Sequence, residues 1–210
     1  MRKLALILLI ASAGACSTKK DATQTDTTAL STTTTTTAGT ETPIASTETA
    51  VAPEVNPPGD IPDSQAFVIY QNTTGGYQLE VPEGWARATT RGNVTFVSKL
   101  DGVSVTIAPA SAAPSAASVQ ANEAKLIQSQ GRAVTITGMS EANLPGGKAV
   151  VIKYTSNSEP NSVTNKRVRL ENVAYIFYKN GKEATLTVWA PQGADNADQW
   201  NRMANSLRWL

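Results

Sequence analysis

Apolar and polar positions alternate along most of the chain from residue 64 onward, and this period of two predicts a series of β-strands. The segments with this pattern are 66–71, 77–82, 94–100, 103–109, 133–139, 148–156, 166–179 and 182–190. Turn residues separate them. Asn180-Gly181 is the strongest turn signal because this pair suits the tight loop of a two-residue hairpin. Asp101-Gly102 and Pro145-Gly146-Gly147 predict two further hairpins.

Two stretches have a helical period instead. Residues 118–131 combine helix-forming residues with Ser118 as the expected cap and Gly131 as the expected stop. Residues 195–210 predict a closing helix whose apolar face consists of Trp200, Met203, Ala204 and Leu207, with Asp195 or Asn196 as its cap. One helix is therefore expected in the middle of the strand series and another at its end.

The strand around Val173–Tyr178 is apolar on both faces, which is typical of a central strand covered from both sides. Strands that follow one another with few helices predict the α+β class, an antiparallel β-sheet flanked by helices. Residues 64–210, 147 in number, have a usual size for a single domain with one core.

The start of the chain has the anatomy of a secretory signal. Arg2 and Lys3 precede an apolar run of residues 4–10, which is too short to span a bilayer, and small residues follow. We therefore predict that residues 1–15 are a signal peptide. Cys16, the only cysteine of the chain, comes directly after Ala13-Gly14-Ala15.

This arrangement resembles the lipobox of bacterial lipoproteins, although leucine is usual where Ala13 stands. The resemblance implies that Cys16 is lipidated and becomes the first residue of the mature chain. It also implies attachment to a membrane through the lipid, on the extracytoplasmic side. Ser17, rather than aspartate, follows the cysteine, so both the cell membrane and the outer membrane are open. The alternative is an ordinary signal peptide with a stray cysteine.

Residues 16–63 predict a lipidated cysteine followed by a disordered tether. Fourteen of the thirty residues from 21 to 50 are threonine, and prolines follow between 53 and 62. Such a segment has too few large apolar groups to offset the entropy lost on ordering. The expected organisation is thus signal peptide 1–15, tether 16–63 and domain 64–210.

The sequence GGYQLEVPEGW at 75–85 has a physical explanation of its own. Pro82 ends a strand because it cannot donate to the ladder, Gly84 permits a turn, and Trp85 folds back over the sheet. The motif also resembles the opening hairpin of the PsbP-like fold, which includes lipoproteins of the LpqN type. The closing segment WNRMANSLRW is similar to the last helix of that fold. Members of that group bind other proteins or are uncharacterised, and they share no catalytic residues, so the resemblance implies no catalytic residue in this chain.

Few kinds of chemistry are open to this chain. It has no histidine, which excludes serine–histidine and cysteine–histidine nucleophile pairs and the usual zinc sites. We predict no cofactor, no metal and no catalytic residue. The carboxylates of Glu80 and Glu83, on either side of Pro82, leave a carboxylate-dependent cell-wall hydrolase as a remote alternative.

Basic residues concentrate at one place in the domain. Lys166, Arg167 and Arg169 lie close together, and strand alternation would put Arg167 and Arg169 on the same face. These two arginines are the candidate contacts for an anionic partner, although a solvated strand face that discourages edge pairing explains them equally well. No nucleic-acid-binding motif is present, and we expect no nucleic-acid partner.

Together these features favour a lipid-anchored binding or scaffolding protein of the bacterial cell envelope that is not an enzyme. Its partner, an envelope protein or ligand, is not identified by the sequence. A different class, a small-ligand or lipid carrier, remains open and would need a sizeable apolar cavity between sheet and helices.

Overall fold

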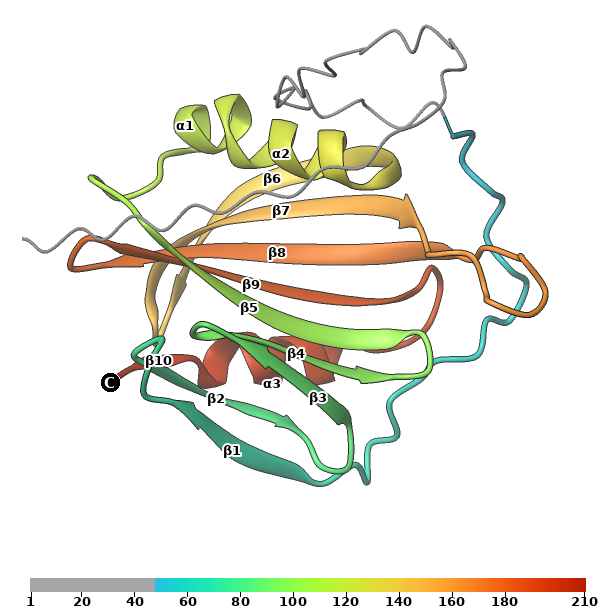
Figure 1. The fold of residues 1–210 in the computed structure, drawn as a ribbon, viewed down its shortest axis with the longest axis horizontal. Helices are drawn as coiled ribbons and strands as arrows, with labels where there is room; N and C mark the ends of the chain where they lie inside the picture. The colour runs from blue at the N-terminus through green and yellow to red at the C-terminus, as the bar shows by residue number, and fades with distance from the viewer. Residues whose placement is uncertain (1–47) are drawn as a thin grey trace, which may run out of the picture. The chain divides into compact units, whose positions relative to one another are not determined.

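Two antiparallel sheets form the framework of the chain, for which a computed structural model describes residues 48–210 (Figure 1). The larger sheet has the strand order β3-β4-β5-β9-β8-β7-β6, and the smaller has the order β1-β2-β10. The strands are β1 (Phe67–Asn72), β2 (Tyr77–Pro82), β3 (Ala86–Thr90), β4 (Asn93–Ser98), β5 (Asp101–Pro109), β6 (Arg132–Leu144), β7 (Gly147–Asn157), β8 (Arg169–Lys179), β9 (Lys182–Pro191) and β10 (Arg208–Trp209). The predicted signal peptide, Cys16 and the first part of the predicted tether lie outside the described residues.

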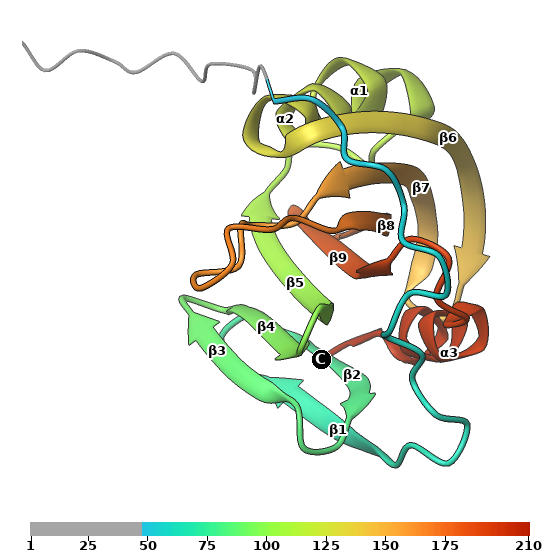
Figure 2. The ribbon, with the colours of Figure 1, turned by 90° about the vertical axis from the view of Figure 1, so that its right-hand side faces the viewer.

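Three helices complete the described part of the chain: α1 (Ala116–Ala121), α2 (Glu123–Gln130) and α3 (Ala197–Ser206). The pair α1 and α2 lies on one side of the larger sheet, and α3 lies on the other side together with the smaller sheet (Figures 1 and 2). Antiparallel sheets flanked by helices confirm the predicted α+β class. In residues 48–210, every helix is too short or too polar to span a membrane.

Strand β8 is central and covered on both faces, as its apolar pattern predicts. Its odd-numbered residues Val173, Tyr175 and Phe177 join the core with β2, β5, β9 and α3. Its even-numbered residues Ala174 and Ile176 pack with β7 and with the helix pair. Strand β9 instead alternates, with Ala184, Leu186 and Val188 fully buried toward one side only.

The β4–β5 hairpin does not turn where the sequence predicts. The two turn residues are Lys99 and Leu100, so Asp101 and Gly102 begin strand β5. Gly102 is explained by packing, because a Cβ atom on it would lie 1.9 Å from the ring of Trp189 across the sheet. The predicted turn at Asn180-Gly181 is confirmed, and both residues have the positive φ of a type I′ turn.

Both predicted helices are shorter than expected. Residues 118–131 divide at Asn122 into α1 and α2, and α1 is capped by Ser115 in a capping box with Ser118 rather than by Ser118 itself. The closing helix α3 ends at Ser206 because residues 208 and 209 form β10, which pairs with β2.

The motif at 75–85 has the predicted structural role. Pro82 is the last residue of β2, Gly84 has a φ of +83°, and Trp85 packs half-buried against the core. The strand that follows, β3, was not predicted because all five of its residues are exposed at the edge of the sheet and show no apolar alternation.

The sequence assigns residues 48–63 to the tether, whereas the structure shows them in contact with the domain that begins at residue 64. Residues 48–63, hereafter the strap, pack along the domain from β6 to α3 (Figure 2). Ile61 is only 4% exposed, and Gly59 adopts a φ of +133° where a Cβ atom would meet Pro191. The strap contributes a single large buried side chain, which is why its composition gives so little indication of order.

We predict that Ile176→Ala lowers the free energy of unfolding by about 2–5 kcal/mol, because Ile176 is fully buried between β8 and the helix pair. The matched control is Ile69→Ala, at a side chain that is 65% exposed, where we expect less than about 0.5 kcal/mol. Urea denaturation of both variants measures the difference. Equal losses at the two positions would contradict the burial of this second face of the sheet.

Candidate functional site

Three polar side chains meet at the same end of strands β6, β7 and β8. Arg132 begins β6, Asn157 ends β7 and Arg169 begins β8. They are neighbours across the sheet, because Arg132 is opposite Asn157 and Asn157 is opposite Arg169. Antiparallel pairing thus gathers residues that are up to 37 positions apart in the sequence. With Arg167, just before β8, they form the strand-end cluster.

Arg169 is not available at the surface as a strand-face arginine would be. It is 5% exposed, and its guanidinium donates to Ala133 O (2.8 Å), Asn157 Oδ1 (3.0 Å) and Thr155 Oγ1 (2.6 Å). Burial lowers the pKa of Arg169, and its hydrogen-bond acceptors within the described residues are neutral. The structure therefore places Arg169 as an internal organiser of the cluster rather than on a shared outer face with Arg167.

Glu48 of the strap is the acidic partner that the structure gives to this cluster. Its carboxylate lies 2.8 Å from Arg132 Nη1 and 2.9 Å from Arg167 Nε, and it accepts a hydrogen bond of 2.7 Å from Asn157 Nδ2. The Arg167 contact is an ion pair, since the guanidinium Nε makes no hydrogen bond of good geometry there. Arg167, predicted as a contact for an anionic partner, here contacts a carboxylate of its own chain.

Asn157 also contacts the backbone of the strap. Its Nδ2 donates to Thr49 O at 2.9 Å, and its Oδ1 accepts from Val51 N at 3.0 Å. The amide side chain therefore pairs with two main-chain groups of an extended segment much as a neighbouring strand would. Hydrogen bonding to the main chain of an extended segment is a recognised way of binding peptides.

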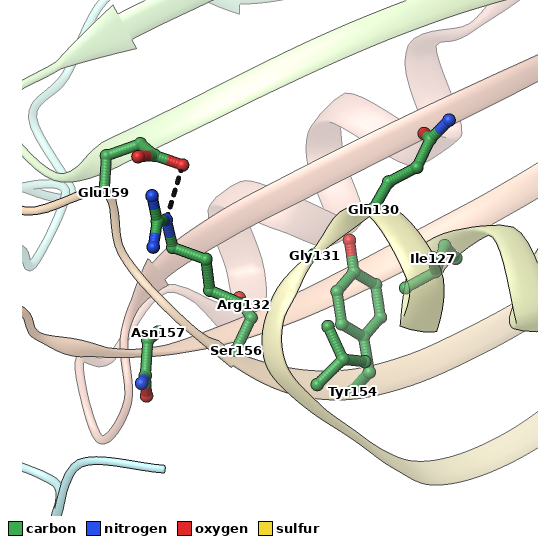
Figure 3. Close-up of a pocket in the computed structure, with 9 residues that line it drawn as sticks. Ile127, Gln130, Gly131, Arg132, Tyr154, Ser156, Asn157 and Glu159 are labelled. Atoms are coloured by element: carbon green, nitrogen blue, oxygen red, sulfur yellow. Dashed lines mark hydrogen bonds and ion pairs between the residues drawn. The ribbon is translucent and has the colours of Figure 1, made fainter. Parts of the chain in front are cut away.

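An open hollow of about 300 Å³ lies beside the cluster, between α2 and the edge of the sheet (Figure 3). Ile127, Val134 and Tyr154 form its apolar part. Its polar rim consists of Gln130, Arg132, Ser156, Asn157 and Glu159. In Figure 3 the Arg132 side chain extends toward Glu159, to which its Nε donates at 2.9 Å. The hollow is accordingly suited to a side chain or a small polar group rather than to a lipid tail.

The charges in this region keep Glu48 ionised. The hydrogen bond from Asn157 lowers the pKa of Glu48 most strongly, and Arg132 and Arg167 lower it further against the effect of burial. The pKa of Tyr154 in the hollow is raised to about 12 by burial, so this hydroxyl stays protonated near neutrality. The strand-end cluster is therefore held together by charge pairing and by hydrogen bonds to an ionised carboxylate.

The other end of the strap is held by a different kind of contact. Asn196, predicted as a helix cap, makes no capping bond and is 1% exposed. Its side chain instead accepts from Ile61 N (2.6 Å) and donates to Gly59 O (2.8 Å). Asp63 adds a hydrogen bond from Gln199 of α3. The hydrogen bonds of the buried Asn196 side chain and the burial of Ile61 hold this end of the strap more firmly than the other.

The remaining carboxylates singled out in the sequence lie elsewhere. Glu80 is paired with Arg202 of α3 at 2.6 Å, and Glu83 lies exposed in the turn after β2. Asp195 precedes α3, and its backbone N–H donates to Asp60. Within residues 48–210, no three acidic, cysteine or histidine side chains are grouped as for a metal ion.

Sequence reasoning missed Glu48, Arg132 and Asn157. Glu48 stood in a threonine-rich segment without apolar pattern, and Arg132 and Asn157 each lie at the margin of a predicted strand. A usable signal was the pairing itself, because antiparallel pairing brings the first residue of one strand beside the last residue of its neighbour. Without the register, that signal does not select these residues.

Comparison with protein-family models and with curated proteins finds no match. Solved structures similar to this chain include cyanobacterial PsbP (CyanoP) from Synechocystis sp. PCC 6803, with 17% identity and a TM-score of 0.46, covering 73% of this chain and 99% of that one. A protein of Bacteroides thetaiotaomicron VPI-5482 has 9% identity and a TM-score of 0.45, covering 67% of this chain and 47% of its own. The Pseudomonas aeruginosa protein PA94 has 15% identity and a TM-score of 0.36, covering 64% and 91%.

The first of these structures is of the PsbP-like kind that the motif at 75–85 resembles. At this identity and TM-score the likeness concerns shape, and none of the three similarities carries a function to this chain.

We predict that the free energy of unfolding falls as the pH rises through the pKa of Asp101. This carboxyl group lies beneath the strap beside Gly59. Burial and then the charge of Asp60 raise the pKa of Asp101 from 3.8 to about 7, while Lys99 opposes them. Between these two values the folded protein keeps a proton that the unfolded chain has released, so the stabilising contribution is complete below the lower value and is lost through the upper one.

Asp101→Asn removes this loss, and we expect the variant to gain about 1–3 kcal/mol over wild type at pH 8 and little at pH 4. Urea denaturation across this range measures the gain. Glu54→Gln, an exposed carboxylate of the same strap, is the control and should leave the pH dependence unchanged. A constant difference between Asp101→Asn and wild type at every pH would contradict the assignment.

Proposed function

We propose that the chain is a lipid-anchored, extracytoplasmic binding or scaffolding protein of a bacterial cell envelope, without catalytic activity. It would be attached through Cys16 to the cell membrane or the outer membrane and would present its α+β domain to another envelope component. Kinship with lipoproteins that carry a PsbP-like domain of the LpqN type belongs to the same proposal.

The observation that carries this proposal is the position of Cys16. A basic start, a short apolar run and three small residues lead directly to the only cysteine of the chain. A lone thiol in an exported protein has no partner for an internal disulfide and calls for another use. Lipidation provides one, and several acyl chains hold a protein firmly because each buried methylene contributes about 0.8 kcal/mol.

The folded part of the chain supports a binding role. The strand-end cluster holds an acidic, extended segment by two arginines and one amide side chain. Such a combination of charge and backbone contacts is suited to recognising another polypeptide. The hollow beside the cluster is small, open and partly polar, which favours a peptide over a lipid as the ligand.

To test the anchor, we expect Cys16→Ala to abolish incorporation of a clickable fatty acid and to move the protein out of the membrane fraction. The substitution removes the only thiol that the lipid can join. Labelling of the immunoprecipitated protein measures the effect. Ser17→Ala, one position along, is the matched control and should label as wild type does. A labelled Cys16→Ala protein would refute lipidation at this residue.

To test the binding role, the wild-type chain is isolated from membranes in mild detergent and its companions are identified by mass spectrometry. The control carries residues 1–47 fused to an unrelated domain, because the strap already belongs to the folded part. We expect a companion in stoichiometric amount with the wild-type chain only. Identical recoveries from the two samples would count against a binding function of the domain.

A further inference from the structure

We propose that the strand-end cluster is a binding site for an acidic, extended segment of a partner protein, and that residues 48–51 occupy this site in cis until the partner displaces them. The proposal deepens the binding role above and depends on it only for the origin of the partner. Whether the site binds a peptide in trans is decided with purified protein, independently of the lipid anchor.

The cluster recognises two features of its present occupant. Arg132 and Arg167 contact the carboxylate of Glu48 at 2.8 and 2.9 Å, and Asn157 adds a charge-assisted hydrogen bond of 2.7 Å. The same amide contacts Thr49 O and Val51 N, so it selects an extended backbone without reading a side chain. A ligand with glutamate followed by three extended residues satisfies every one of these contacts.

The site is held together by contacts that do not involve the strap. Arg132 is also tied to Glu159, and Asn157 accepts from Arg169, whose guanidinium is itself fixed by Thr155 and Ala133. These bonds fix Arg132 and Asn157 from within β6, β7, β8 and the loop after β7. A site that keeps its shape without its occupant binds a second ligand at lower entropic cost.

Charge favours an acidic ligand over a neutral one. Three arginines gather at the cluster, and the acidic groups paired with them are Glu48, from the strap, and Glu159. When the strap leaves, the cluster keeps the three arginine charges, and Glu159 is the carboxylate that still pairs with one of them. The uncompensated charge is the complement of an incoming carboxylate and opposes exposure of the empty site.

The two ends of the strap differ in how firmly they are held. Thr49 and Ala50 are exposed, and Glu48 and Val51 are half-buried, so residues 48–51 depend on polar contacts at the rim of the domain. Ile61 is buried, and its N–H is bonded to the buried Asn196. Contacts of the first kind contribute little net free energy and exchange readily with equivalent ones, whereas buried contacts do not. Displacement therefore releases residue 48 onward and leaves the strap attached at Ile61.

The hollow of Figure 3 gives a partner something that the strap does not use. It opens beside Arg132 and Asn157, and its lining contains no residue of the strap. An apolar side chain of a longer partner segment would contact Ile127, Val134 and Tyr154 there. A partner with such a residue thus gains contacts that residues 48–51 do not make, which is what displacement requires.

The test uses full-length protein in detergent and a fluorescent, end-blocked peptide with the sequence of residues 46–54, STETAVAPE. We expect the peptide to bind the Glu48→Gln protein at least about tenfold more tightly than wild type. In wild type the covalently linked segment competes at an effective concentration in the millimolar range. The matched peptide with glutamine in place of its first glutamate, the one that corresponds to Glu48, should bind neither protein. Adding Asn157→Ala to the Glu48→Gln protein should abolish binding of the acidic peptide.

A second measurement needs no substitution. Excess acidic peptide should speed hydrogen exchange at the Val51 amide of wild-type protein and leave exchange at the Ile61 amide unchanged, since only the first lies in the displaced segment. No binding to the Glu48→Gln protein together with unchanged exchange at Val51 would overturn the proposal and leave the cluster as a fixed clamp. Conversion of a wild-type dimer to monomers by the peptide would also overturn it, because the occupant would then be a second copy.

Discussion

The need to cover both faces of the central strands determines how the rest of the chain is arranged. Strands β7 and β8 place apolar side chains on both sides of the sheet, so neither side can face water. The helix pair after β5 covers one side with Val119 and Ala124. The other side needs more, and the chain supplies α3 and the small sheet of its first two and last strands. Both ends of the domain are thereby drawn into one core.

The ends of the strands are not covered in this way. Polar side chains gather there because the hydrogen-bond ladder of the sheet stops at these residues. At the end formed by Arg132, Asn157 and Arg169, the chain uses internal hydrogen bonds and one acidic residue brought by the strap. The buried charge of Arg169 has internal acceptors only, whereas Arg132 and Arg167 are partly exposed and pair with the carboxylate of the strap. The strap therefore serves both as structure and as the occupant of a site, and one stretch of chain connects the predicted anchor to the place where recognition is proposed.

The sequence predicts the parts of this fold that depend on local pattern and fails where distant residues decide. The covered strand at Val173–Tyr178 and the turn at Asn180-Gly181 are both recovered from residue types alone. Gly102 was wrongly predicted as a turn residue. Glycine is required there because Trp189 of another strand packs against it, and turn preferences do not take such a contact into account. Arg169 misled because alternation gives a face but not a depth, and its acceptors come from β6 and β7. The order of the strap was not predicted, because one buried isoleucine is too weak a signal in a segment rich in threonine and proline.

The order in which the strap meets the domain has a mechanical consequence. If the anchor is loaded, tension enters the domain at Glu48, because this residue is the first described contact along the chain. The contacts then break in sequence order, with those of Glu48 first, those of Val51 next and those of Ile61 last. Force on the lipid end and occupation of the strand-end cluster by a partner would work in the same direction. A domain attached in this way would bind more readily under tension than at rest.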